Sequence, residues 1–124
     1  MYVRLAGEDE VAAVDPDFRA LTAHGLVGVN VFAGSGTRWK TRMFSPLDGV
    51  GEDAATGSAA GPLACHLARH GEIAWDEQIE IAQGAEIGRP STLYARVTGS
   101  GQTVEAVEVG GSAVTVARGE FRIP

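Results

Sequence analysis

Short apolar runs separated by glycines and charged residues make up the first third of the chain. The run at Tyr2–Leu5 fits an opening strand, and Val11 and Val14 fit the inner side of a short helix in an acidic stretch. A further helix is predicted to start at Asp15 and Pro16, because a carboxylate caps free amides and proline suits the first helical position.

The middle of the chain predicts two strands followed by one helix. Leu26–Ala33 is rich in β-branched residues, and in Thr37–Phe44 successive residues alternate between the two faces expected of a strand. A glycine-containing turn joins the two segments. After a loop over 45–56, the segment Ser58–His70 is apolar on almost every side, which is typical of a buried helix. Because Pro62 lacks an amide hydrogen, either the regular helix starts near Gly61 or its first turn is distorted.

The last third of the chain reads as strands alone. One buried helix among many strands predicts an α+β fold, in which a mixed or antiparallel sheet is rolled around the central helix. The expected strands are Ile79–Ala82, Thr92–Val97, Thr103–Val109, Ala113–Ala117 and Phe121–Ile123.

Composition narrows the class of protein. A chain of 124 residues without a linker is expected to form a single domain over 1–124. The net charge of −6 and the lack of a basic cluster exclude a nucleic-acid partner. No apolar stretch is long enough for a membrane span and Met1 is not followed by a signal-peptide pattern, so we expect a cytoplasmic protein without a membrane partner. The single cysteine, Cys65, excludes an internal disulfide and a two-thiol racemase.

The loop before the predicted buried helix carries the most distinctive chemistry. Glu52 and Asp53 stand just before a run of small residues that leads into the helix. The first amides of a helix lack intrahelical partners and carry partial positive charge, so they can hold a carboxylate or phosphate. The candidate anion-binding residues are Thr56, Gly57, Ser58 and Ala59, with Asp53 placed to accept from a hydroxyl or amine of the same ligand.

Each of these features also has a plainer interpretation. Asp, Thr and Ser before a helix are common capping residues. His66 and His70 have metal-ligand spacing, but no third ligand lies nearby in the sequence, so we expect core packing for His66, a charge at the helix end for His70 and no metal. Arg89 lies in a predicted turn, where structural pairing is the default and ligand contact the alternative.

Two sets of motifs resemble those of a known family. The pattern Arg42-x-Phe44-x-Pro46-x-x-Gly49-x-x-Glu52-Asp53-x-Ala55-Thr56-Gly57-Ser58-Ala59 resembles the signature of the PhzF-like (phenazine biosynthesis) isomerases. Downstream, Gln83-Gly84-x-x-x-Gly88-Arg89-Pro90-Ser91 and Gly110-x-x-Ala113-Val114 are similar to later motifs of the same family, in the same order. The resemblance covers nearly the whole chain, yet only the C-terminal half of the family.

The resemblance implies a fold and an activity. Full-length members are similar to diaminopimelate epimerase, with two pseudo-symmetric domains and an active site between them. Their general-base glutamate belongs to the N-terminal half, which this chain does not resemble. The family pattern implies that Asp53 orients the substrate, that Gly57 and Ser58 bind its carboxylate, and that a proton-shifting isomerisation proceeds without a cofactor. Ala54 replaces the family's usual proline.

Two functions of different kinds follow. In the first, the chain is half of an isomerase acting on a small carboxylic acid, and a separate chain, a missing domain or a second copy completes the cleft. In a homodimer Glu52 would be the substitute base, since like charges beside each other favour proton uptake by one of them. In the second, the chain is a non-catalytic module that binds a carboxylate or a protein. The chain can also be a piece of a full-length isomerase.

Overall fold

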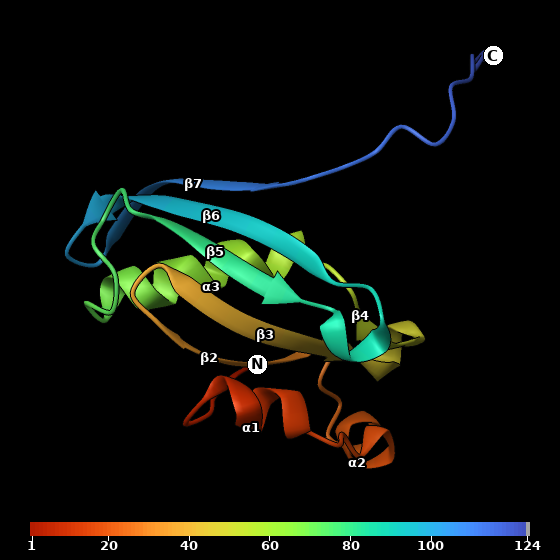
Figure 1. Cartoon of the computed structure of the whole chain (residues 1–124), viewed down its shortest axis with the longest axis horizontal. Helices are drawn as coiled ribbons and strands as arrows, with labels where there is room; N and C mark the ends of the chain where they lie inside the picture. The colour runs from red at the N-terminus through yellow and green to blue at the C-terminus, as the bar shows by residue number, and fades with distance from the viewer. Residues whose placement is uncertain (124) are drawn as a thin grey trace.

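A computed structural model describes residues 1–123, and Figure 1 shows one strongly curved sheet wrapped around one side of a long helix. The seven strands follow the order β1-β2-β3-β5-β6-β7, with β4 paired to β3. β1 and β2 are parallel, as are β3 and β5, while the other pairs are antiparallel. The elements are β1 (Tyr2–Arg4), α1 (Glu8–Ala13), α2 (Phe18–Ala23), β2 (Val29–Ser35), β3 (Arg38–Ser45), η1 (Pro46–Asp48), β4 (Val50–Asp53), α3 (Gly57–Arg69), β5 (Gln78–Gln83), η2 (Ala85–Ile87), β6 (Ser91–Ser100) and β7 (Thr103–Gly111).

Two apolar clusters lie on opposite faces of this sheet. On the concave face, Leu63 and Leu67 of α3 pack fully buried against Ile79 and other strand residues. On the convex face, Val11 of α1 packs against alternate residues of β2, among them Val31. This alternation follows from the pleat, which sends successive side chains to opposite faces. The expected α+β fold, a mixed sheet rolled around one helix, is confirmed.

Helix α3 corrects two expectations about its shape. It is α-helical from Gly57 onward, so it neither starts near Gly61 nor loses its first turn. Pro62 lies inside it, where its missing amide deprives only the Ser58 carbonyl of a partner, and both residues are exposed to solvent. The helix is also not buried all round, because His66 on the same open side is exposed instead of packed in the core.

Three other expectations are wrong in detail. The second helix is capped by Asp17, whose carboxylate accepts from the Ala20 amide at 2.9 Å, and not by Asp15. The predicted loop over 45–56 contains β4, which forms because the end of β3 offers it an unpaired edge. The segments 113–117 and 121–123 form no strands, because β7 ends the sheet and the chain then leads away from it (Figure 1).

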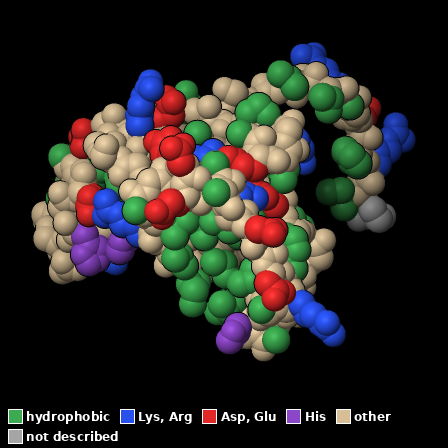
Figure 2. All heavy atoms as spheres, turned by 60° about the horizontal axis from the view of Figure 1, so that its bottom comes forward, with side chains coloured by type: hydrophobic (Ala, Val, Ile, Leu, Met, Phe, Trp, Pro, Cys, Tyr) green, Lys and Arg blue, Asp and Glu red, His purple; other side chains and the backbone are tan. Residues whose placement is uncertain are grey.

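The segment 112–123 is called the C-terminal arm below. Its large apolar side chains find no core to enter, and Figure 2 shows the arm standing apart from the body with hydrophobic side chains along it. Their exposed fractions are 84% for Val114, 91% for Val116, 92% for Phe121 and 92% for Ile123. Among residues 1–123, no helix is both long and apolar enough to cross a bilayer.

Candidate functional site

The site forms where two strands end against the same edge of β3. The first half of β3 pairs with β5 through Lys40, and its second half pairs with β4 from Met43 onward. Because β5 runs parallel to β3 and β4 runs antiparallel, the C-terminal ends of both strands point toward each other. Asp53 and Gln83, the last residues of these strands, therefore meet beside the start of α3.

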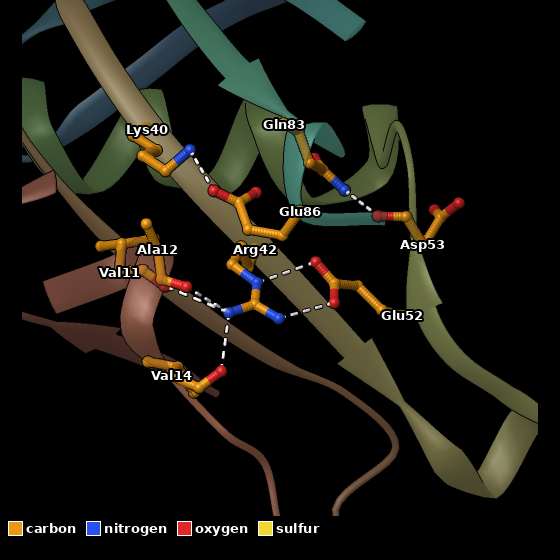
Figure 3. A network of polar contacts seen from close by, with 9 residues as sticks. All are labelled: Val11, Ala12, Val14, Lys40, Arg42, Glu52, Asp53, Gln83 and Glu86. Carbon is orange, nitrogen blue, oxygen red and sulfur yellow. Dashed lines mark hydrogen bonds and ion pairs between the residues drawn. The ribbon is translucent and has the colours of Figure 1, made fainter. Parts of the chain in front are cut away.

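The adjacent carboxylates of β4 serve different surroundings. Glu52 pairs with Arg42 through two hydrogen bonds, Nε to Oε1 at 2.9 Å and Nη2 to Oε2 at 2.8 Å, and both side chains are less than 10% exposed. Arg42 also donates to three carbonyls around the end of α1, those of Val11, Ala12 and Val14 (Figure 3). The hydrogen bonding to Glu52 raises the pKa of Arg42. With both oxygens engaged by a buried cation, Glu52 anchors α1 to the sheet, which argues against its role as a substitute base.

The Asp53 carboxylate points the other way and joins a network at the helix start. Its Oδ2 accepts from the Thr56 hydroxyl at 2.7 Å. The Gln83 amide nitrogen donates to the Asp53 carbonyl at 2.7 Å and to Thr56 Oγ1 at 2.9 Å, while its oxygen accepts from the Thr56 amide at 3.2 Å. A fourth bond comes from the Thr41 hydroxyl to the same oxygen at 3.3 Å. These contacts leave Asp53 Oδ1 without a hydrogen bond from the described residues.

Of the four residues predicted to bind an anion, two keep a backbone amide that makes no hydrogen bond within the described part of the chain. The amide of Thr56 is occupied by Gln83, and the amide of Ala59 donates to the Thr56 carbonyl at 3.0 Å. Within the described part of the chain, the amides of Gly57 and Ser58 make no hydrogen bond. They lie at the N-terminal end of a thirteen-residue helix, where the backbone dipoles add partial positive charge. The structure therefore brings Asp53, Gly57 and Ser58 together, and gives Thr56 and Ala59 supporting places.

Both sides of this helix start are hollowed. Asp53, Thr56 and Ser58 line a cavity of about 310 Å³ whose other wall includes Met43 and Val50. Gly57 and Ala55 line a second cavity of about 560 Å³ against the end of β7. The first cavity presents carboxylates and hydroxyls together with apolar side chains, which suits a small molecule with one polar and one apolar side.

Gly57 has no structural need to be glycine. A Cβ built at this position would meet only Val109 Cγ1 at 3.8 Å, an ordinary contact, and its backbone is helical. Gly61, one turn later, differs because a Cβ there would lie 2.9 Å from Val107 Cγ1. A glycine that packing does not require leaves the backbone amide open to close approach by a ligand.

Gln83 belongs to a motif noted in the sequence, but sequence reasoning gave it no role at the site. It stands in a strand whose residues alternate between exposed and buried, and its position falls on the buried side, where it is 2% exposed. A polar residue at a buried position of an alternating strand is the signal that could have singled it out. Arg89, by contrast, is exposed, and its backbone amide donates to the Gly84 carbonyl at 2.9 Å.

His66 of α3 and His70, which caps the C-terminal end of this helix, lie outside this site. The rings of His66 and His70 lie 4.4 Å apart, and partial burial of the otherwise exposed His66 ring, together with the charges of His70 and Arg4, lowers the pKa of His66. Across residues 1–123, no group of three or more His, Cys, Asp or Glu side chains is placed to hold a metal ion.

A mixed sheet curled around one helix defines an α+β domain, and among residues 1–123 the start of this helix combines a carboxylate with two amides that make no hydrogen bond. The chain belongs to the PhzC-PhzF family, whose family model, described as phenazine biosynthesis-like protein, matches residues 1–119.

Known relatives agree with this assignment. The chain is 55% identical over 119 residues to trans-2,3-dihydro-3-hydroxyanthranilate isomerase of Pseudomonas chlororaphis and 56% identical to the enzyme of the same name from Pseudomonas aeruginosa. Each match covers 96% of this chain and 43% of the relative, so the chain spans less than half the length of these curated relatives.

Solved structures show the same fold. A PhzC/PhzF-type protein from Clostridium difficile matches with a TM-score of 0.74 at 24% identity, over 98% of this chain and 44% of that one. A Pseudomonas aeruginosa protein named as a predicted epimerase matches with a TM-score of 0.59 at 29% identity, over 94% and 43%.

Proposed function

We propose that this chain is the substrate-holding half of a PhzF-type isomerase, which shifts a proton on a small cyclic carboxylic acid without a cofactor. A second chain or domain corresponding to the family's N-terminal half supplies the general base. The observation that carries the proposal is the pair of unpaired amides at Gly57 and Ser58 beside the free oxygen of Asp53.

Each of these groups has a defined task in the proposed reaction. The amides of Gly57 and Ser58 hold the substrate carboxylate, and the helix dipole favours the negative charge that grows when a neighbouring carbon loses its proton. Asp53 Oδ1 accepts from an amine or hydroxyl of the substrate and so fixes the face that meets the base. Holding both ends of the substrate restricts the proton transfer to one geometry, which is the main contribution such a half can make.

The relatives suggest the substrate class. Two relatives at 55% and 56% identity are named for an isomerisation of trans-2,3-dihydro-3-hydroxyanthranilate, a molecule with a carboxylate, an amine and a hydroxyl on one ring. The cavity beside Asp53 offers apolar walls from Met43 and Val50 for such a ring. We therefore propose an aminated or hydroxylated cyclic carboxylic acid as the substrate.

A proton acceptor must come from outside this chain. Among the described residues that line the two cavities, Asp53 and Asp48 carry the only carboxylates. Asp53 is held by Thr56, and Asp48 accepts from the Ser45 hydroxyl at 2.7 Å. Glu52 is bound to Arg42 on the other face of the sheet. A partner that brings its own base is therefore a better fit than a homodimer relying on Glu52.

The first experiment tests binding by the chain alone. In ¹⁵N-labelled protein titrated with 3-hydroxyanthranilate, a stable aromatic probe, the amide signals of Gly57 and Ser58 should shift most. The variant Gly57→Val should abolish these shifts, because its side chain covers the amide. Shifts confined to another part of the protein would contradict the proposal.

The second experiment tests turnover. The chain is mixed with the N-terminal half of the Pseudomonas chlororaphis relative and supplied with trans-2,3-dihydro-3-hydroxyanthranilate. We expect isomerisation by the mixture and none by either half. A non-catalytic binding module is the alternative, favoured by the engaged state of Glu52, and it predicts probe binding with no turnover in any mixture.

A further inference from the structure

We propose that Gln83 is a positioning residue for the site, which fixes the direction of the Thr56 hydroxyl proton and thereby leaves Asp53 with one free carboxylate oxygen. The inference deepens the proposed function and rests on it for its kinetic consequences, although the structural part can be tested on the chain alone. Figure 3 shows the Gln83 amide reaching from the end of β5 to the backbone of Asp53.

The amide of Gln83 has all of its hydrogen-bonding capacity in use. Its nitrogen donates to the Asp53 carbonyl and to Thr56 Oγ1, and its oxygen accepts from the Thr56 amide and the Thr41 hydroxyl. An amide rotated by 180° would set its donors against the Thr56 N–H and its oxygen against the Asp53 carbonyl. The neighbouring backbone groups therefore dictate one orientation of this side chain.

This orientation decides where the Thr56 proton goes. Because the Gln83 nitrogen already donates to Thr56 Oγ1, the hydroxyl must donate its own proton elsewhere, and Asp53 Oδ2 lies 2.7 Å away. The bond from a neutral hydroxyl to a carboxylate is short and strong. It turns Oδ2 of Asp53 toward the protein, and Oδ1 remains for a ligand.

Burial makes the arrangement rigid. Gln83 is 2% exposed and Thr41 is 1% exposed, so the Gln83 amide itself is largely shielded from water. The neighbouring Gly84 adds a backbone restraint, since a Cβ there would lie 2.7 Å from the Ala54 carbonyl oxygen. The end of β5 thus holds both the side chain of Thr56 and the backbone of the Asp53–Ala54 turn.

The distinguishing feature of a positioning role is that it acts on the orientation of Asp53 more than on anion binding. The amides of Gly57 and Ser58 do not contact Gln83 and should still hold a carboxylate when Gln83 is changed. Loss of Gln83 should therefore lower kcat by about tenfold and alter KM by less than about threefold.

The structural test measures the Asp53 side chain directly. Three-bond couplings in labelled protein report whether its χ1 angle occupies one rotamer. We expect one rotamer in the native chain, averaging in Gln83→Met, and one rotamer in the control Thr41→Val, which removes the fourth bond of Gln83 without touching Asp53 or Thr56. A single unchanged rotamer in Gln83→Met would overturn the inference.

Variants of Thr56 keep the inference testable if Gln83→Met does not fold. Thr56→Val removes the hydroxyl at constant shape and should release Asp53 in the same way, whereas Thr56→Ser should restore the single rotamer. Rotamer averaging of Asp53 that is as strong in Thr56→Ser as in Thr56→Val would also contradict the inference.

Kinetics of the reconstituted enzyme complete the test. Gln83→Glu keeps the acceptors for the Thr56 amide and Thr41 but loses both donors, so it should show the same fall in kcat as Gln83→Met. Full kcat per folded molecule in both variants would overturn the inference. Absence of turnover in the native mixture would contradict the proposed function instead, and the rotamer measurement would still decide the role of Gln83.

Discussion

Glu52 and Asp53 are neighbours in β4, yet their carboxylates serve opposite faces of the sheet: Glu52 binds Arg42 beneath α1, and Asp53 binds Thr56 at the start of α3. The pleat of the strand enforces this separation. Of two adjacent acids that look like a catalytic pair in the sequence, one is therefore paired with a buried arginine and the other lies at the candidate site.

The first prediction follows from this separation. Glu52→Gln should lower the free energy of unfolding by about 3 kcal/mol, because it leaves the guanidinium of Arg42 buried without its carboxylate. Urea denaturation measures the loss. Glu72→Gln, which breaks the exposed pair with Arg4, is the matched control and should change stability little. A Glu52→Gln variant of native stability whose reconstituted enzyme has no turnover would return Glu52 to the catalytic machinery.

The second prediction separates two roles of glycine in α3: access of a ligand to the backbone at Gly57, and packing against β7 at Gly61. Gly57→Ala should leave the unfolding free energy equal or raise it by about 0.5 kcal/mol, since the new methyl has room and the unfolded chain loses freedom. The same methyl should weaken binding of 3-hydroxyanthranilate by obstructing the amide. Gly61→Ala should do the reverse, lowering stability by about 1 kcal/mol through its clash with Val107 and leaving the affinity unchanged. Isothermal calorimetry and thermal unfolding of the two variants measure both effects, and identical behaviour of the pair would contradict the assignment.

The third prediction concerns Asn30. It lies in a row across the sheet with Tyr2, Met43 and Asp53, is 2% exposed, and its Oδ1 has no hydrogen-bond partner among residues 1–123. An unpaired buried acceptor is costly, so Asn30→Val should raise the unfolding free energy by about 1 kcal/mol. The control Thr41→Val removes a paired buried hydroxyl and should lower it. Destabilisation by Asn30→Val would show that the amide has a partner after all.

The fourth prediction concerns pH. Burial by itself raises the pKa of Glu86, but hydrogen bonds from Lys40 and from its own backbone, with the charges of Lys40 and Arg42, bring that pKa below its ordinary value of 4.5. A carboxylate with a lowered pKa in the folded protein stabilises it above pH 4.5, and this contribution is lost as the pH falls through the folded value.

The variant Glu86→Gln isolates this contribution. It should be about 1 kcal/mol less stable than the native chain at pH 7, and the difference should shrink as the pH falls below 4.5 and through the lowered pKa of Glu86 in the folded protein. Glu80→Gln, at an exposed position of β5, is the control for the loss of one glutamate charge and should change stability little at pH 7. A difference between Glu86→Gln and the native chain that does not shrink at all as the pH falls below 4.5 would rule out the charge as its cause.

The central part of the fold could be predicted because local and global signals agree there. The β-branched run of β2 and the apolar run of α3 each predict a buried element, and the structure buries residues 29–33 and most of α3. The alternation expected in β3 is present only through Thr41, because Arg42 is buried as well. The C-terminal arm has the same strand-like pattern at Val114 and Val116, but within residues 1–123 it pairs with no strand. Pattern alone predicts the tendency to form a strand and cannot supply the neighbour.

The site could be predicted in part. Unpaired amides at a helix start follow from the geometry of any helix, so Gly57 and Ser58 were accessible to sequence reasoning. The engagement of Glu52 by Arg42 was not, because it depends on the register that places these residues on one face with the end of α1. Gln83 is remote from Thr56 in the sequence, and only the meeting of β4 and β5 against β3 brings them together.

The C-terminal arm also affects whether the purified protein associates in solution. Next to it, β7 is an edge strand with an unpaired row of backbone groups, and Val107 and Val109 on it are 43% and 44% exposed. An unpaired edge strand beside the exposed apolar C-terminal arm, which has a strand-like pattern, is a template for aggregation. We expect the purified chain to associate as its concentration rises, and a version shortened after Gly111 to remain dispersed in light-scattering measurements. The experiments above therefore require that association through the C-terminal arm be prevented first.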